Sequence, residues 1–223
     1  MDIITFGNID SDNILIQMVG EHELSFLGKE VEYIKNLAET DDFGLMAVKV
    51  ESWNRDLSPW EAPAVFGDEP FGGRAEQTLE ELKGIIDSEL LRGRDASDVN
   101  LYIGGYSLSG LFALWSVYNV NYFKGAAAVS PSVWFPGFDE YISGRDIGTD
   151  AVYLSLGKKE EKTRNQVMAR VGEVIKDIER QLQPKLRCTL EWNEGNHFKE
   201  PEVRTAKGFA WLLRNQECKV TER

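Results

Sequence analysis

The sequence predicts an α/β fold in which a mostly parallel central sheet is covered by helices on both faces, a three-layer sandwich. Short apolar runs alternate with segments of helical periodicity along nearly the whole chain. The runs are also too apolar for strands with one face in water, which is typical of parallel sheets. With 223 residues and no linker or internal repeat, we expect a single domain over residues 1–223.

Five largely apolar runs are predicted strands, and they cover residues 14–19, 45–50, 99–103, 125–129 and 152–156. Residues 187–192 are the last predicted strand. Apolar spacing predicts helices over about 29–39, 79–90, 111–115, 167–182 and 206–213. Thr163 and Gln166 form a capping box that should begin the fourth of these helices, and Pro184 ends it. Residues 51–73 are rich in proline and glycine and should form a long loop, which in a compact domain is usually functional.

Composition limits the classes of function. The net charge of −12 argues against nucleic-acid binding, because phosphate contacts need clustered Lys and Arg. The first residues resemble no signal peptide, and no apolar run approaches the length of a membrane span. Cys188 and Cys218 should be reduced thiols. We therefore predict a cytoplasmic protein with no membrane or nucleic-acid partner, no metal and no other cofactor.

The most specific segment, residues 99–115, joins an apolar run to an apolar helix around a serine. Such a strand–turn–helix is the nucleophile elbow of α/β-hydrolases, whose tight turn needs small residues two before and two after the serine. Gly105 and Ser109 hold these positions around Ser107. Were Ser109 the nucleophile, Ser107 and Leu111 would crowd the turn, so Ser107 is the better candidate. The alternative is an ordinary serine in a glycine-rich turn.

An acid and a histidine follow the later predicted strands. Glu160 and Glu161 come after the strand that ends near Gly157, and His197 comes after the last strand. The order serine, acid, histidine is that of the α/β-hydrolase triad. We prefer Glu160 to Glu161, because a short turn from Gly157 brings it back toward the sheet edge; both could instead be solvated loop charges. His197 could be a surface histidine, yet it lies where the fold needs a base.

Backbone amides near the serine should bind the oxyanion of an acyl-transfer intermediate. Leu108, directly after Ser107, should supply one amide, and Gly20 or Glu21, after the first predicted strand, the second. His22 is more suited to the rim of a pocket than to a metal site. Several loop residues could line a substrate pocket or simply pack in the loops: Trp53, Arg55, Trp60, Trp134 and Phe135. For Arg55 an ion pair with Asp56 is the more conservative interpretation.

Several segments resemble a known family, the esterases of the α/β-hydrolase fold that include feruloyl and siderophore esterases. They are residues 55–60, 104–112, 127–132, 156–160 and 195–198. The resemblance spans nearly the whole chain, although only the elbow and histidine segments are specific. It implies serine-dependent ester hydrolysis with Ser107, Glu160 and His197 as the triad. Ser109 replaces the usual glycine, residues 17–20 lack the histidine that relatives often carry, and strands that usually precede Ile14 should be reduced or absent.

The predicted function is therefore carboxylic-ester hydrolysis through an acyl-enzyme on Ser107, with a small-molecule ester as the substrate. Two other functions fit the same residues. A thioesterase or acyltransferase would use the same triad with another donor or acceptor. A non-catalytic protein of this fold would bind a ligand, although such proteins tend to lose one triad member.

Overall fold

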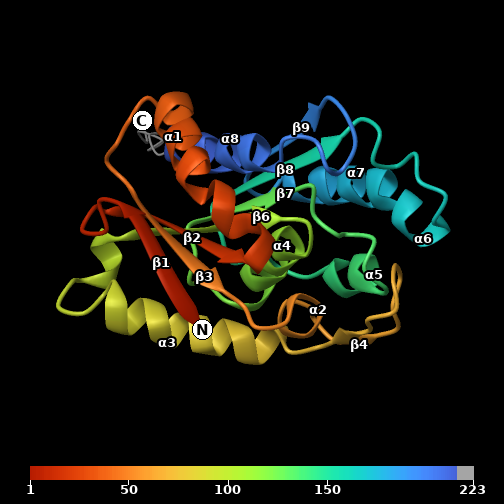
Figure 1. Cartoon of the computed structure of the whole chain (residues 1–223), viewed down its shortest axis with the longest axis horizontal. Helices are drawn as coiled ribbons and strands as arrows, with labels where there is room; N and C mark the ends of the chain where they lie inside the picture. The colour runs from red at the N-terminus through yellow and green to blue at the C-terminus, as the bar shows by residue number, and fades with distance from the viewer. Residues whose placement is uncertain (215–223) are drawn as a thin grey trace.

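The computed structural model describes residues 1–214 and is built on one seven-stranded sheet (Figure 1). The strand order is β1-β3-β2-β6-β7-β8-β9, and only β1 is antiparallel to its neighbour. The strands are β1 (Asp2–Gly7), β2 (Asn13–Val19), β3 (Gly44–Lys49), β6 (Asn100–Tyr106), β7 (Gly125–Val129), β8 (Ala151–Gly157) and β9 (Arg187–Asn193). The predicted mostly parallel sheet is confirmed.

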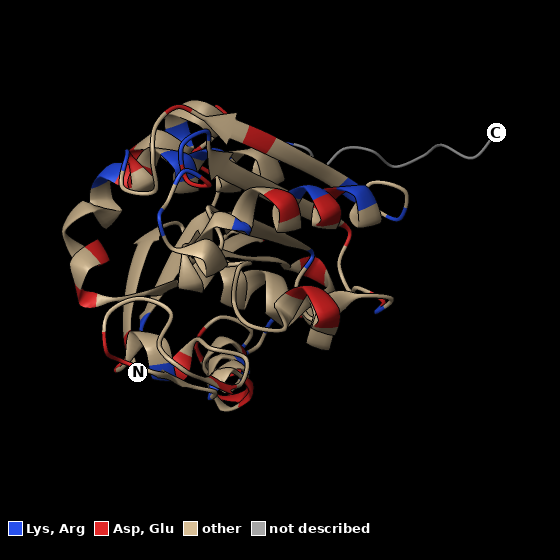
Figure 2. Cartoon of the chain, turned by 90° about the vertical axis from the view of Figure 1, so that its right-hand side faces the viewer, with Lys and Arg blue, Asp and Glu red and all other residues tan. Residues whose placement is uncertain are grey.

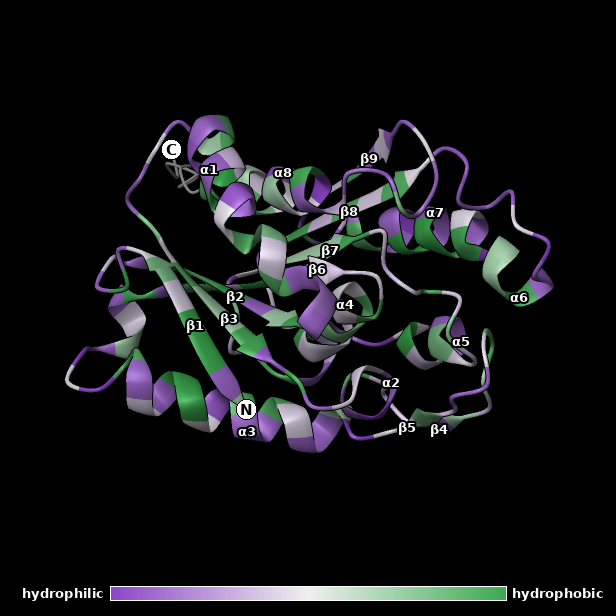
Figure 3. Ribbon diagram, viewed as in Figure 1, coloured by the Kyte–Doolittle hydropathy of each residue, from purple (hydrophilic) through white to green (hydrophobic). Residues whose placement is uncertain are grey.

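Helices cover both faces of the sheet. One hydrophobic cluster joins α1 (Leu27–Ala38) and α8 (Pro201–Arg214) to one face, and a second joins α3 (Ala75–Glu89), α4 (Leu108–Asn119) and α7 (Val171–Leu182) to the other. Strand β2 serves both clusters, since Ile14 and Ile16 face one and Leu15 faces the other. Figure 3 shows the apolar central strands between helices of mixed hydropathy. The three-layer arrangement is therefore confirmed.

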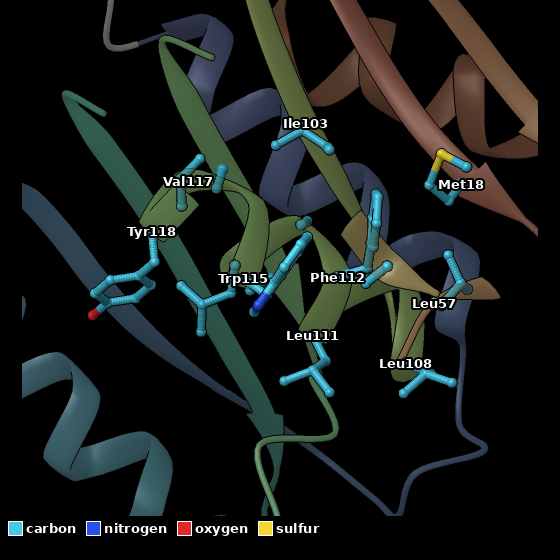
Figure 4. Packing of buried hydrophobic residues seen from close by; sticks show 14 of the residues in the cluster. Met18, Leu57, Ile103, Leu108, Leu111, Phe112, Trp115, Val117 and Tyr118 are labelled. Atoms are coloured by element: carbon cyan, nitrogen blue, oxygen red, sulfur yellow. The ribbon is translucent and has the colours of Figure 1, made fainter. Parts of the chain in front are cut away.

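The helix after the candidate serine is buried along nearly its whole length. Figure 4 shows Leu111, Phe112 and Trp115 of α4 in one cluster with Met18 of β2 and Ile103 of β6. Phe112 is fully buried, and burial of such a side chain contributes about 1.5–3 kcal/mol. This packing fixes α4 against the strands on which the candidate site is built.

The shorter elements lie mostly in the connections. They are the 3-10 helices Glu21–Phe26 and Ala96–Asp98, the helices α2 (Trp53–Asp56), α5 (Phe138–Ile142) and α6 (Gln166–Ala169), and the two-residue strands β4 (Glu61–Ala62) and β5 (Phe71–Gly72). Residues 51–73 are thus a long loop, as predicted, that carries one helical turn and a minimal hairpin.

Three predictions of local structure need correction. Residues 2–7 form the edge strand β1, which the sequence hid because most of its residues are exposed and give no buried apolar run. Helix α5 was likewise not expected. The capping box is wrong: Asn165 caps α6 by accepting from the amides of Val167 and Met168, and Thr163 accepts from the Asn165 amide instead. Helix α7 then begins separately at Val171.

The structure also bears on the predictions about charge, membrane spans and cysteines. Figure 2 shows acidic and basic residues interspersed on the helices and loops around the sheet. Among residues 1–214 no helix has both the length and the apolar character needed to cross a bilayer. Cys188 has a free thiol, whose pKa burial raises to about 12. Cys218 lies outside the described residues.

Candidate active site

Ser107 lies at a sharp turn between β6 and α4. Its backbone has φ 60° and ψ −120°, a conformation that is costly for a residue with a Cβ. The Ser107 amide donates to the carbonyl of Val129, and its carbonyl accepts from the amides of Leu111 and Ser132, each at 3.0 Å. These bonds to β7, α4 and the loop after β7 hold the turn in its unfavourable conformation.

Close packing explains the sequence around the turn. A Cβ on Gly105 would lie 1.9 Å from Oγ of Ser109, and a Cβ on Gly110 would lie 2.8 Å from the carbonyl oxygen of Gly105. The Ser109 hydroxyl donates to the carbonyl of Met18 at 2.7 Å. Ser109 therefore fits where the familiar motif has glycine, and it ties the elbow to the end of β2.

The structure brings Ser107, Glu160 and His197 into one hydrogen-bonded chain. Nε2 of His197 lies 3.0 Å from Oγ of Ser107, and Nδ1 lies 2.7 Å from Oε2 of Glu160. All three follow the carboxyl ends of strands (β6, β8 and β9), where ligands bind in open parallel sheets. Glu161 is placed elsewhere, because its Oε2 packs against the Cα of Gly172 at the start of α7.

The Glu160 carboxylate is buried and fully engaged. Its Oε1 accepts from the Ser130 hydroxyl and the Gly157 amide, each at 2.7 Å, and from Nη1 of Arg204 at 3.1 Å. Burial by itself would raise the pKa of Glu160, but the hydrogen bonds and charge of His197, with those from Ser130 and Gly157, hold the pKa below its usual value. An ionised Glu160 accepts a hydrogen bond from Nδ1–H of His197, which leaves Nε2 as the acceptor for the Ser107 hydroxyl.

Two further side chains hold the backbone of the histidine loop. The Tyr106 hydroxyl donates to the carbonyl of His197 at 2.6 Å, and burial raises the pKa of Tyr106 to about 12, so it stays a donor. Arg204 of α8 donates to the carbonyls of Glu194 and Asn196. Sequence reasoning missed Tyr106, Ser130 and Arg204. The position of Ser130 after β7 was a usable signal, whereas nothing in the helical spacing singled out Arg204.

The candidate oxyanion donors lie on adjacent strands. Gln17 pairs with Gly104 across β2 and β6, and residues 20–21 and the turn at Ser107 follow the carboxyl ends of these two neighbouring strands. Leu108 begins α4, where an amide has no partner within its helix. The Gly20 amide instead donates to Oε2 of Glu23 at 2.8 Å. Of the two expected second donors, this leaves the amide of Glu21, the first residue of a 3-10 helix.

A cleft lies beside this loop. It has a volume of about 470 Å³, and its lining includes Gly20, Glu21, His22 and Trp53. The imidazole of His22 is mostly exposed and meets Trp53 edge to face, with ring centroids 5.2 Å apart. His22 is thus at a pocket rim, as expected, and Trp53 is the predicted pocket residue that lines this cleft.

The other predicted pocket residues are placed differently. Arg55 is bound by Asp56 and Glu51, in accordance with the conservative interpretation. Trp60 packs edge to face on Phe135 and donates from Nε1 to the carbonyl of Pro136. Trp134 is buried and contacts Phe66 and Phe71. Within residues 1–214, no three His, Cys, Asp or Glu side chains lie close enough to share a metal ion.

Comparison with known proteins establishes the fold class. No family model and no curated protein matches the sequence. Solved structures do match, and they identify the chain as an α/β-hydrolase fold, in agreement with the sheet and helices described above.

Three of these structures show the extent of the similarity. An IroE-like serine hydrolase from Shewanella oneidensis matches with a TM-score of 0.73 and 13% identity over 95% of this chain and 75% of its own. The siderophore hydrolase EstA from Aspergillus nidulans matches with a TM-score of 0.66 and 16% identity, over 92% of this chain and 84% of its own. A Bacillus cereus carboxylesterase matches with a TM-score of 0.61 and 17% identity, over 96% of this chain and 94% of its own. At these identities the similarity is one of fold.

Proposed function

We propose that this protein is a serine hydrolase that cleaves carboxylic esters, with Ser107 as nucleophile, His197 as general base and Glu160 as the acid that orients it. The observation that supports this most strongly is the unbroken chain from Oγ of Ser107 through the imidazole to the Glu160 carboxylate, with separations of 3.0 and 2.7 Å. The strained turn at Ser107 supports it further, because such strain persists mainly at functional sites.

The reaction proceeds in two matched halves. In the first, Oγ of Ser107 attacks the ester carbonyl while Nε2 of His197 accepts its proton, and Glu160 stabilises the imidazolium. His197 then protonates the departing alcohol, which leaves the acyl group on Ser107. In the second half, water takes the place of the serine hydroxyl, and the same proton transfers release the carboxylic acid.

The developing oxyanion needs donors fixed beforehand. We propose the amides of Leu108 and Glu21, which begin two helices at the ends of the adjacent strands β6 and β2. Loss of one such donor typically costs about 3–4 kcal/mol of transition-state stabilisation. The cleft lined by Glu21 and Trp53 contains one of these two proposed donors but none of the triad residues, and we propose that it holds one side of the ester.

The fold neighbours guide the choice of substrate. They include a siderophore hydrolase and a carboxylesterase, and esters are the substrate class we propose for this chain. A thioester donor would use the same serine and histidine, so the ester must be compared directly with a thioester of the same acyl group.

Matched p-nitrophenyl esters and acyl thioesters of short chain length provide the test. We expect hydrolysis of the esters, and a loss in kcat of about 10⁴-fold or more in Ser107→Ala and His197→Gln. Ser88→Ala, at an exposed serine on α3, is the matched control and should retain full activity. Hydrolysis of the thioester alone would favour a thioesterase. No hydrolysis of either substrate would favour a binding protein.

A further inference from the structure

We infer that Arg204 is a positioning residue, which holds the Glu160 carboxylate and the loop that carries His197 in one fixed arrangement. The catalytic consequence of this inference rests on the proposed function. Its structural content, the placement and titration of His197, can be measured without any substrate.

Arg204 joins the acid to the histidine loop through a single guanidinium. Nη1 donates to Oε1 of Glu160 at 3.1 Å, and Nη2 donates to the carbonyls of Glu194 and Asn196 at 2.8 and 3.0 Å. Because these groups come from the turn after β8 and the loop after β9, one side chain sets the distance between them. That distance determines whether Nδ1 of His197 meets Oε2 of Glu160.

The backbone around Arg204 leaves room for its guanidinium and directs carbonyl groups toward it. Gly195 lies between the two accepting carbonyls with φ 99°, a conformation that favours glycine and turns both neighbours toward Arg204. Gly157 leaves room for the network, since a Cβ there would lie 3.0 Å from Nη1 of Arg204 and 2.8 Å from Oε1 of Glu160.

Tyr106 completes the arrangement from the nucleophile side. Its hydroxyl accepts from Nη1 of Arg204 at 3.2 Å and donates to the carbonyl of His197 at 2.6 Å. The histidine backbone is therefore held twice, once through the carbonyl of Asn196 and once through its own carbonyl. Tyr106 also precedes Ser107 directly, so the network links all three members of the proposed triad.

The burial of Arg204 indicates that it fixes one arrangement of the site rather than simply stabilising the fold. Arg204 is only 2% exposed, and its Nη1 lies 3.1 Å from the equally buried Glu160. A buried ion pair is generally no more stabilising than apolar side chains of the same size, and is retained in some proteins because it fixes one arrangement. Lysine keeps the charge but lacks the planar fork that reaches a carboxylate and two carbonyls together.

The charge of Arg204 acts on the same pair. With Arg204 present, protonation of the pair formed by His197 and Glu160 takes the net charge of the pair from −1 to 0 and so weakens its attraction to the buried Arg204 cation. Without it, protonation becomes easier, so the titration midpoint should move to higher pH. Two further titratable groups that feel this charge are Tyr106 of β6 and Tyr153 of β8, and burial raises the pKa of both, so they stay neutral near pH 7.

Three variants separate the charge from the fork. Arg204→Met removes both, Arg204→Lys keeps the charge, and Lys207→Met is the matched control. Lys207 lies one turn further along α8 and binds Glu191 and Asn193 of β9, so it also joins α8 to β9 without touching the acid or the histidine loop. Circular dichroism and thermal unfolding establish that each variant is folded.

The first readout is an NMR titration of the imidazole in a His22→Gln background, where His197 is the single remaining histidine. We expect Arg204→Met to raise the midpoint by about one pH unit or more, the usual size of a shift from a neighbouring charge. Arg204→Lys and Lys207→Met should stay close to the parent. An unchanged midpoint in a folded Arg204→Met would overturn the role of the charge.

The second readout is the rate of reaction with a fluorophosphonate, measured on the plateau of its pH profile. It should fall by about 100-fold in both Arg204 variants, the loss expected from a displacement of roughly 1 Å, and stay unchanged in Lys207→Met. If Arg204→Met does not fold, Arg204→Lys decides: a parental rate there overturns the positioning role. If the parent protein does not react at all, the proposed function fails, and the NMR titration alone decides the inference.

Discussion

Backbone strain at Ser107 leads to a prediction about the relative stability of two inactive variants. At φ 60° and ψ −120° a Cβ is held in an unfavourable conformation that glycine tolerates. We therefore compare Ser107→Gly with Ser107→Ala. Both variants lack the hydroxyl and its contacts with His197 and Ser132, so the difference between them reports the backbone conformation.

The magnitude follows from two opposing effects. A residue in such a sparsely populated conformation carries about 1–3 kcal/mol of strain. Glycine loses more chain entropy on folding, which costs about 0.5–1 kcal/mol relative to alanine. Ser107→Gly should therefore be more stable than Ser107→Ala by about 0.5–2 kcal/mol, while both are inactive.

Urea unfolding of the two variants measures this difference. With an m-value of about 3 kcal/mol/M, the midpoint of Ser107→Gly should lie about 0.2–0.7 M higher. The control pair is Glu80→Gly and Glu80→Ala on the exposed face of α3, where glycine should be the less stable by about 1 kcal/mol. If Ser107→Gly were also the less stable of its pair, the turn would carry no strain and this reasoning would be refuted.

Three further predictions follow from the structure. Burial raises the pKa of Glu23 to about 7, so the stability that its protonated form contributes is present below pH 4.5 and is lost as pH rises through 7. In wild-type protein the free energy of unfolding, measured with urea, should therefore fall by up to about 3 kcal/mol between pH 5 and pH 8. Glu23→Gln should remove this pH dependence. Glu160→Gln should lower kcat by about 10⁴-fold, whereas Glu161→Gln should retain it, and equal losses would contradict the choice of acid. Gly105→Ala should lose about 1–3 kcal/mol in denaturant unfolding, and adding Ser109→Gly should restore part of it; simple additivity would show that the two side-chain positions do not clash.

The sequence predicted the sheet and the order of the three candidate residues because both depend on local signals. Buried strands of a parallel sheet are continuous apolar runs, and their carboxyl ends meet at one edge. Ser107 and Glu160 follow such runs, and His197 follows the half-buried last strand β9, so their meeting required only the correct fold. The choice of Glu160 over Glu161 depended on a single turn after Gly157.

Features that depend on side-chain packing could not be predicted in this way. Strand β1 lies at an exposed edge and lacks an apolar run. The engagement of Glu160 by Arg204 joins residues that are distant in the sequence, and no local spacing predicts their pairing. The Gly20 amide and Glu23 do have the spacing of a capping box, but Gly20 has no side chain to mark it. The aromatic loop residues were expected at one pocket, yet the structure divides them, because Trp53 lines the cleft and Trp60 packs on Phe135.

Labelling with a fluorophosphonate followed by peptide mapping tests the central claim most directly. We expect one adduct, on the peptide that contains Ser107. It should be absent from Ser107→Ala and from urea-unfolded wild-type protein, because the hydroxyl reacts only when His197 accepts its proton. An adduct on another residue, or labelling that survives in Ser107→Ala, would contradict the account.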